Sequence, residues 1–201
     1  LERDERVHLY YTNNVDDITK ADIILLPGSK NTLDDLYELR RNGVAQAILK
    51  ASQEGATVMG ICGGYQMMGL EVRDPEGVEG NVRMLPGLGL LPVITTMQGD
   101  KVTRQVEFTF DGTEALCKGY EIHMGRTVPA EGSPPSPFNQ LADGREDGYQ
   151  DKQKKCLGTY IHGILDNQPF IDFLLAPYIG KLGQQTFDYT AFKEEQYDKL
   201  A

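Results

Sequence analysis

The chain has 201 residues, with 20 Lys and Arg against 30 Asp and Glu, and a formal net charge of −10. This length fits one α/β domain with a well-buried core and leaves little room for a second domain. The acidic balance argues against nucleic acid or an anionic membrane as the main partner. No apolar run approaches the length of a bilayer span, and the charged residues 1–6 are unlike a signal peptide, so we expect a cytoplasmic protein.

The first part of the chain alternates between strand-like and helix-like segments. Runs of apolar and β-branched residues predict three strands, over residues 7–11, 23–26 and 57–60. Helical spacing predicts two helices between the second and third strand, over residues 33–40 and 44–51, with an N-cap at Asn31 or Thr32. The order strand, helix, strand predicts a parallel sheet with a right-handed crossover. The two strand-to-helix corners, at Gly28 and Cys62, then lie at the sheet edge where such folds place their sites.

The second part of the chain predicts strands first and helices last. After a polar loop at residues 71–80, strands are expected over residues 84–93, 101–110, 119–126 and 156–163. The proline-rich segment 128–145 predicts a loop. Helices are expected over residues 169–178 and 187–201.

Three cysteines, Cys62, Cys117 and Cys156, are spaced irregularly and include no Cys-x-x-Cys pair. They fit neither a disulfide framework nor a zinc site, so we expect reduced thiols, with Cys117 and Cys156 inert. No His or Cys cluster has the spacing of metal ligands, and no complete nucleotide-binding glycine motif is present. We therefore expect neither a metal nor a bound nucleotide in this chain.

The segment 57–69 has the pattern of a nucleophile at a sharp turn. A β-branched apolar run ends at Gly60, Cys62 follows, and Gly63 and Gly64 lead into an apolar stretch with helical spacing. Glycines around a nucleophile allow a tight strand-to-helix turn that holds the side chain at its tip. At a helix N-terminus, unpaired N–H groups and the helix dipole favour the thiolate. We predict Cys62 as a nucleophile, and a buried structural cysteine is the alternative.

A cysteine nucleophile needs a base, and the chain has three histidines. His8 lies in the first expected strand and is interpreted as structural. His123 lies within a strand whose alternation can direct its side chain into a pocket. His162 lies at the end of a strand and precedes a glycine, at a position where functional residues concentrate. We predict His162 as the base.

Residues 60–66, Gly-Ile-Cys-Gly-Gly-Tyr-Gln, resemble the Gly-x-Cys-x-Gly-x-Gln signature of the class I glutamine amidotransferases. Further segments resemble the cobyric acid synthase family within that class, in the same order and across nearly the whole chain: residues 27–32, 87–92, 101–104, 119–123 and 158–163. The resemblance implies an α/β fold with a mostly parallel open sheet flanked by helices, the flavodoxin-like architecture of class I glutamine amidotransferases. It also implies glutaminase activity.

The resemblance gives several residues a chemical role. Cys62 attacks the side-chain amide of glutamine, and His162 accepts the thiol proton and passes it to the departing ammonia. Three residues are expected to supply the backbone N–H groups of the oxyanion hole: Gly28, Ser29 and Gly63. Four residues are expected to bind glutamine: Gln66, Gly64, His123 and Glu121. Tyr120, Glu121 and His123 can equally be strand residues whose polar groups are satisfied by their neighbours.

In that family the complete protein has an N-terminal ATP-binding synthetase domain that resembles dethiobiotin synthetase, and this sequence contains none of it. We therefore expect residues 1–201 to be one glutamine amidotransferase domain excised from a longer protein, which also fits a start without Met. No cofactor is expected in this domain, since ATP and Mg²⁺ belong to the absent one. The expected partners are glutamine, the synthetase domain and, through that domain, a corrinoid. The corrinoid is adenosylcobyrinic acid a,c-diamide, which is amidated at its b, d, e and g carboxylates.

The sequence departs from the general amidotransferase pattern after the base. That pattern is His-x-Glu, but the residue two after His162 is Ile164. The triad is reduced to a dyad, as in cobyric acid synthases and their relatives, and three carboxylates are candidates for orienting the imidazole: Glu121, Asp147 and Asp166. Loss of the orienting carboxylate is costly in serine proteases, so weak glutaminase activity is expected for the domain in isolation.

Three alternatives share parts of this pattern. A glutaminase subunit of a cell-wall peptide-amidating complex has the same fold and also lacks the third triad member. A non-catalytic docking domain keeps the fold without the chemistry. A cysteine-elbow hydrolase or redox sensor predicts a peroxide-sensitive Cys62 that is indifferent to glutamine. Lys101 and Arg104 are either ordinary strand-face charges or a docking surface for the synthetase domain.

Overall fold

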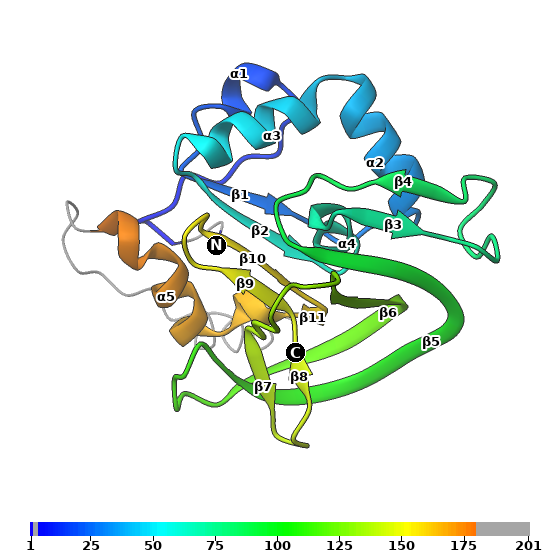
Figure 1. Ribbon diagram of the computed structural model, residues 1–201. Coiled ribbons are helices and arrows are strands. Elements are labelled where there is room, and N and C mark those ends of the chain that lie inside the picture. Colours follow the sequence, from blue (N-terminus) through cyan, green and yellow to red (C-terminus); the bar gives the residue numbers. More distant parts are fainter. Residues whose placement is uncertain (2–3, 180–201) are drawn as a thin grey trace, which may run out of the picture.

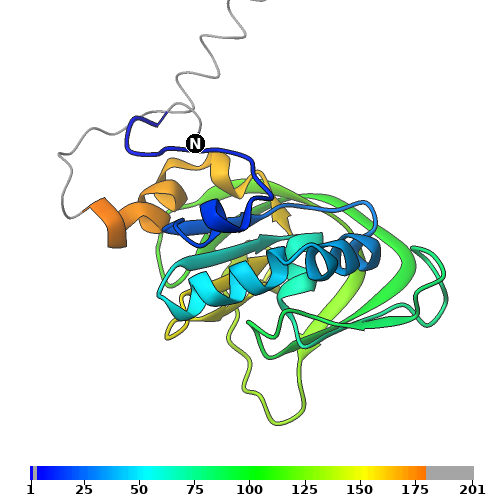
Figure 2. The same ribbon diagram turned by 90° about the horizontal axis from the view of Figure 1, so that it is seen from above.

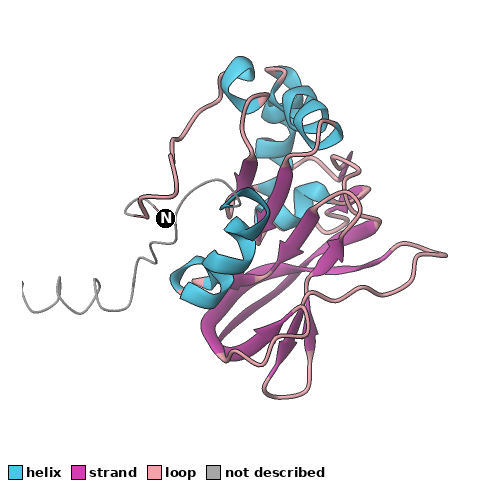
Figure 3. Ribbon diagram, turned by 90° about the vertical axis from the view of Figure 1, so that its left-hand side faces the viewer, coloured by secondary structure: helices cyan, strands magenta, loops and turns pink. Residues whose placement is uncertain are grey.

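The computed structural model describes residues 1 and 4–179. Its strands form two sheets, one of four strands and one of seven. Helices lie on both sides of the smaller sheet, and the larger sheet packs beside it (Figures 1 and 3). Within the described residues, no helix is both long enough and apolar enough to cross a bilayer.

The smaller sheet has the strand order β1-β2-β10-β9. β1 (Ile23–Leu26), β2 (Thr57–Ile61) and β10 (Cys156–Thr159) run parallel, and β9 (Tyr149–Asp151) runs antiparallel at one edge. The central strand β2 is buried on both faces, as is usual for a parallel strand that other elements cover on each side. β2 ends directly before Cys62, so the sheet carries this residue at its carboxyl edge.

The larger sheet is mostly antiparallel and is centred on a long hairpin. The hairpin consists of β5 (Val93–Phe110) and β6 (Cys117–Pro129), whose pairing shifts register between Met97 and Val102. It curves around the molecule in Figures 1 and 2. The other strands are short: β3 (Glu71–Arg73), β4 (Met84–Pro86), β7 (Asn139–Leu141), β8 (Glu146–Asp147) and β11 (Ile161–His162).

A short piece of chain joins the two sheets. β10 belongs to the smaller sheet and β11 to the larger one, and only Tyr160 separates them. β11 pairs antiparallel with β6, with His162 opposite Tyr120. His162 is therefore held by the larger sheet, whereas Cys62 follows a strand of the smaller sheet.

The helices follow the signals in the sequence. The Asn31 side chain accepts a hydrogen bond of 3.1 Å from the Asp34 N–H, which makes Asn31 the N-cap of α2. Gly43, with φ 81°, separates α2 from α3. The helical segments of the described residues are α1 (Val15–Ile18), α2 (Thr32–Arg41), α3 (Val44–Gln53), α4 (Gly63–Met68), η1 (Ile164–Asp166) and α5 (Gln168–Ile179).

The apolar core is divided by the smaller sheet. One cluster joins this sheet to helices α2, α3 and α4 and to strands β3 and β5, and the other lies between this sheet, the larger sheet and α5. Alternate residues of β2 enter different clusters, Val58 the first and Met59 the second. The rings of Phe110 and Phe170 pack edge to face in the second cluster, with centroids 5.4 Å apart.

The expected α/β fold with an open sheet flanked by helices is confirmed, and so is the parallel pairing of the strands at residues 23–26 and 57–60. The strand expected at residues 7–11 is wrong. This segment has no regular structure, because no described strand lies beside it to complete a hydrogen-bonded ladder, and the Tyr11 side chain is 88% exposed. The helix expected at residues 169–178 is confirmed as α5, and the one at 187–201 lies outside the described residues.

Candidate active site

Cys62 stands at a strained turn between β2 and α4. Its φ is 54° and its ψ is −111°, a backbone conformation that non-glycine residues rarely adopt. Two hydrogen bonds hold the backbone of this residue. Its N–H donates to the Thr159 carbonyl at 2.8 Å, and its carbonyl accepts from the Gln66 N–H at 3.0 Å. The elbow geometry predicted from the glycine pattern is present. It presents a thiol at the carboxyl edge of the smaller sheet.

The base predicted from the sequence lies beside this thiol. A methyl group built on Gly28 would lie 3.2 Å from Cε1 of His162 and 3.8 Å from Cβ of Cys62, so both side chains flank the same glycine. The Nε2 atom of His162 is buried and has no hydrogen-bond partner among the described residues. A buried ring nitrogen without a partner is unusual in a folded protein, and it is available to accept a proton from the thiol.

The two strand-to-helix corners are in direct contact. A methyl group built on Gly63 would lie 2.7 Å from both the backbone nitrogen and Cβ of Ser29, closer than packed atoms approach. The Ser29 hydroxyl stabilises its own corner, because it accepts from the Asn31 N–H at 3.0 Å and donates to Asp35. The structure thus brings together the three residues expected to form the oxyanion hole, Gly28, Ser29 and Gly63, next to Cys62.

The electrostatics of the thiol differ from the expectation. Burial raises the pKa of Cys62, the Gly63 N–H lowers it, and the negative charge of Glu79 raises it further. The N–H group acts in the direction predicted for the start of α4, but burial outweighs it. Burial thus favours the neutral thiol, so Cys62 would need a base to take its proton in order to act as a nucleophile.

Gln66 and Gly64, expected to contact glutamine, are interior residues. The Gln66 amide is held from two sides, accepting from the Thr32 hydroxyl at 2.8 Å and donating to the Tyr160 hydroxyl at 3.3 Å. Its side chain is buried, as is Gly64, which packs against the Leu26 carbonyl with no room for a side chain. Both residues hold α4 against the neighbouring elements.

Glu79 also belongs to this site, and no local sequence pattern indicated it. Its carboxylate accepts from the Thr32 N–H at 2.7 Å, from the Thr32 hydroxyl at 3.2 Å and from the Leu33 N–H at 3.4 Å, at the start of α2. The loop that carries it is held by Asp74, whose carboxylate accepts from the N–H groups of Val78 and Glu79 at 2.8 Å. The carboxylate thus satisfies the free donors of α2 directly after the Ser29 corner. Burial raises the pKa of Glu79, while the Thr32 and Leu33 N–H groups lower it.

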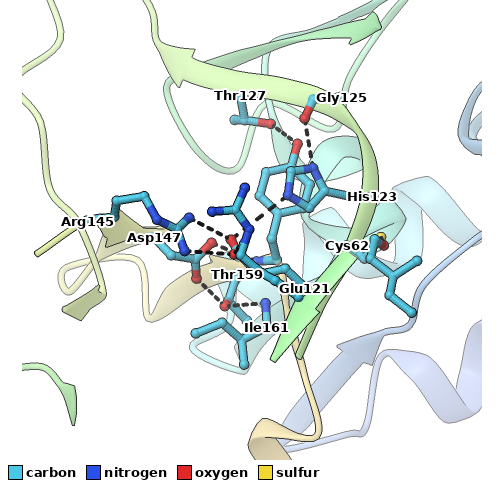
Figure 4. A network of polar contacts seen from close by, with 12 residues as sticks. Cys62, Glu121, His123, Gly125, Thr127, Arg145, Asp147, Thr159 and Ile161 are labelled. Carbon is cyan, nitrogen blue, oxygen red and sulfur yellow. Dashed lines mark hydrogen bonds and ion pairs between the residues drawn. The ribbon is translucent and has the colours of Figure 1, made fainter. Parts of the chain in front are cut away.

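Glu121 and His123 point away from Cys62 (Figure 4). The intervening residue Ile122 accepts a hydrogen bond from the Cys62 thiol at 3.4 Å through its carbonyl, and Tyr120 stacks on His162. The buried carboxylate of Glu121 instead pairs with Arg145 at 3.0 Å and with Arg104 at 3.3 Å. Side chains alternate along a strand, so neighbouring residues of one motif face opposite sides. The structure therefore does not bring the Glu121 and His123 side chains to Cys62.

The far face of β6 borders a cavity of about 620 Å³. Its wall includes three arginines together with the Glu121 and His123 side chains: Arg104, Arg126 and Arg145. The His123 ring stacks on Tyr160 with centroids 3.9 Å apart, its Nδ1 is bonded to the Gly125 carbonyl at 2.9 Å, and burial lowers its pKa. Neither Cys62 nor His162 lines this cavity. Arg104 thus pairs within the domain, whereas Lys101 on the same strand is exposed.

None of the three candidate carboxylates contacts Nε2 of His162, which has no partner among the described residues. Glu121 faces the arginines. Asp147 is buried, and its oxygens accept from the Thr159 hydroxyl, the Asn139 amide and the Tyr160 N–H at 2.5, 2.8 and 3.0 Å. Asp166 lies in η1, after the Gly163 turn. In the described part of the chain, no group of three or more His, Cys, Asp or Glu side chains is placed to hold a metal ion.

Comparisons with known proteins agree with this geometry. Residues 1–170 match the family described as CobB/CobQ-like glutamine amidotransferase domains. The chain is 71% identical to a protein from Phocaeicola vulgatus and 69% identical to one from Bacteroides fragilis, both named cobyric acid synthase. These matches cover 100% of this chain but 40% of each relative, so the chain spans about two fifths of their length.

The fold also matches a solved structure titled "Crystal structure of glutamine amidotransferase". The TM-score is 0.58 at 16% sequence identity, and the match covers 82% of this chain and 83% of the other. At that identity the likeness concerns the fold alone. Together with the family match over residues 1–170, it establishes that the chain is a glutamine amidotransferase of the CobB/CobQ-like domain family.

Proposed function

We propose that this chain is the glutaminase part of a longer cobyric acid synthase and that Cys62 and His162 carry its chemistry. The single observation that supports the site best is the placement of both side chains against Gly28, with Nε2 of His162 buried and unpartnered. The names of the relatives that are 71% and 69% identical support the longer enzyme. The cell-wall, docking and redox alternatives have no comparable support.

In the proposed reaction, Nε2 of His162 takes the proton of the Cys62 thiol as the sulfur attacks the amide carbon of glutamine. The carbonyl oxygen becomes an oxyanion, which the backbone N–H groups of the Gly28, Ser29 and Gly63 corners stabilise. The imidazolium then gives its proton to the departing nitrogen, the C–N bond breaks, and ammonia leaves a γ-glutamyl thioester. Water attacks the thioester with His162 again as base, which releases glutamate and restores the thiol.

The ammonia is used, in this proposal, by an ATP-binding synthetase domain outside residues 1–201. That domain holds ATP and Mg²⁺ and activates the b, d, e and g carboxylates of adenosylcobyrinic acid a,c-diamide for amidation. The corrinoid then meets this chain only through its partner domain. A cytoplasmic location stays a prediction from the sequence.

The proposal is tested by labelling the full-length protein with a diazo-ketone analogue of glutamine, read by intact mass, and by measuring glutamate release. Wild type is expected to take one label and to hydrolyse glutamine. Cys62→Ala should take none, and His162→Ala should react at least 100-fold more slowly. Cys156→Ala is the control, because this buried cysteine lies at the start of β10 and at the opposite end of the strand from the site.

Unlabelled, folded wild type that releases no glutamate would refute the glutaminase proposal. Label on Cys117 or Cys156 instead of Cys62 would refute the assignment of the nucleophile. The larger role is tested separately, by glutamine-dependent amidation of the corrinoid in the presence of ATP and Mg²⁺. Glutaminase activity without amidation would contradict the synthase assignment and leave the dyad intact.

A further inference from the structure

We propose that Tyr120 is a positioning residue for His162 and performs both tasks of the missing triad carboxylate. Its ring holds the plane of the imidazole and stabilises the positive charge that appears when His162 accepts the thiol proton. This inference rests on the proposed function, because it concerns the base of that reaction. The Tyr120 ring explains how a site without His-x-Glu holds its imidazole beside the thiol.

The contact is an almost parallel stack of two rings. The centroids of Tyr120 and His162 are 5.2 Å apart and the planes differ by 8°. The stack follows from the sheet, because the two residues are direct partners in the antiparallel pairing of β6 with β11, where partner side chains share one face. β11 has only two residues and is followed by Gly163, with φ 75°, so little else in this strand fixes the imidazole plane.

The proton-accepting nitrogen is open, and the buried carboxylates of Glu121 and Asp147 bind other residues. Nε2 of His162 has no partner among the described residues, Glu121 points to the far face of β6, and Asp147 is satisfied by Thr159, Asn139 and Tyr160. A ring stack orients an imidazole through its face. It therefore does not occupy Nε2, which remains able to take a proton from Cys62.

The stack stabilises His162 more strongly when its imidazole is protonated than when it is neutral. A neutral imidazole gains only the modest energy of aromatic stacking, about 0.5–1.5 kcal/mol. An imidazolium over the face of a tyrosine is also attracted by the negative charge of the ring face, which acts within about 6 Å. The contact thus favours the protonated state of His162 that follows attack by the thiol. In a triad, the carboxylate supplies this same preference.

The phenol hydroxyl is not required for either task. Tyr120 is 44% exposed, and the interaction with His162 is made by the ring face. Phenylalanine should therefore replace tyrosine, whereas leucine should not. Pentafluorophenylalanine has nearly the same shape but a ring face of reversed charge, so it separates the holding of the imidazole from the stabilisation of its charge.

The test compares four full-length proteins: wild type, Tyr120→Phe, Tyr120→Leu and a variant with pentafluorophenylalanine at position 120. Glutaminase kcat and KM, the rate of labelling by the diazo-ketone analogue and the melting temperature are measured. We expect kcat to stay within 3-fold for Phe and to fall about 10-fold for Leu and for pentafluorophenylalanine, with KM changed less than 2-fold. Tyr11→Leu, in an exposed segment without regular structure, is the control and should equal wild type.

A Leu variant with the kcat of wild type, or a loss that appears only in KM, overturns the inference. An equal loss for Phe and Leu overturns it as well, because the hydroxyl would then be the active group. A loss for Leu with full activity of the pentafluorophenylalanine variant overturns the charge stabilisation and keeps the positioning role. These results differ from failure of the proposed function, in which wild type itself neither hydrolyses glutamine nor takes the label.

Discussion

The two faces of β6 carry different chemistry. On one face, Tyr120 stacks on His162 and the backbone of Ile122 receives the Cys62 thiol, with neutral groups in contact with the dyad. On the other face, the buried carboxylate of Glu121 pairs with two arginines and His123 stacks on Tyr160 (Figure 4). Residues that are adjacent in the sequence thus serve separate environments.

The fold keeps the charge of Glu121 away from the Cys62 thiol. A carboxylate near a thiol opposes formation of the thiolate, as the charge of Glu79 already does at Cys62. Glu121 is on the same strand as the residues that contact the dyad, yet the strand alternation directs its charge to the arginines. Changes on the dyad face should therefore alter chemistry, and changes on the far face should alter stability.

The largest effect is expected from Gly63→Ala, on the dyad side. The new methyl group would lie 2.7 Å from the Ser29 backbone nitrogen, so the two corners have to separate. We expect kcat/KM for glutamine to fall at least 100-fold, the scale of losing an oxyanion-hole donor. Gly99→Ala is the matched control, because a methyl group there meets no atom within 4 Å. Equal kinetics for Gly63→Ala and wild type would contradict the placement of the oxyanion hole.

Glu121→Ala tests whether the far face of β6 contributes to stability and not to catalysis. It removes the carboxylate shared by Arg104 and Arg145, and we expect the free energy of unfolding to fall by about 2–3 kcal/mol, below the usual cost of breaking a fully buried pair because both arginines are partly exposed. Urea denaturation measures this loss. At 15 °C, where the variant stays folded, kcat should remain within about 3-fold of wild type. A 100-fold loss of kcat without loss of stability would place Glu121 in the catalytic machinery.

Glu79→Gln tests whether the negative charge of Glu79 raises the pKa of the Cys62 thiol. Burial raises the pKa of the Cys62 thiol, and Glu79 adds to that rise, so removing this charge should lower the pKa. Labelling of Cys62 by iodoacetamide is expected to increase with pH in both proteins, because the thiolate reacts. The curve of Glu79→Gln should lie at lower pH, with about 3-fold faster labelling at pH 8. An unchanged curve would show that Glu79 does not act on the thiol.

The smallest effect is expected from His123→Phe. The ring can still stack on Tyr160, but the bond from Nδ1 to the Gly125 carbonyl and the 4.0 Å contact of Nε2 with the Glu121 carboxylate are lost. The free energy of unfolding should fall by about 1 kcal/mol, the usual contribution of one hydrogen bond. Because burial lowers the pKa of His123, the ring is neutral near pH 7 and its loss should leave the glutaminase pH profile unchanged. A shifted profile would show that the two faces are coupled.

Local patterns predicted the geometry of the Cys62 turn correctly. The glycines around Cys62 dictate a sharp turn, and the run before it is a strand of the smaller sheet, so the elbow could be found from residues close in sequence. The corner at Gly28 was found in the same way. These features depend on backbone geometry that a few neighbouring residues determine.

The remaining errors involve contacts between distant segments. Residues 7–11 have strand-forming side chains, but a strand also needs a neighbour, and its sequence cannot supply one. Glu121 and His123 were grouped with the dyad because they share a motif, whereas the pairing of β6 with β11 decides which face each side chain takes. Glu79 reaches α2 across more than 40 positions of sequence, as its bond to Thr32 shows, and no local pattern indicates it.

The junction at Tyr160 has a mechanical consequence. The thiol is attached to one sheet and the imidazole to the other, so the distance between nucleophile and base is also a measure of how the two sheets are seated on each other. Because β6 holds the Tyr120 partner of His162, a shift of the β5–β6 hairpin relative to the smaller sheet would change this distance.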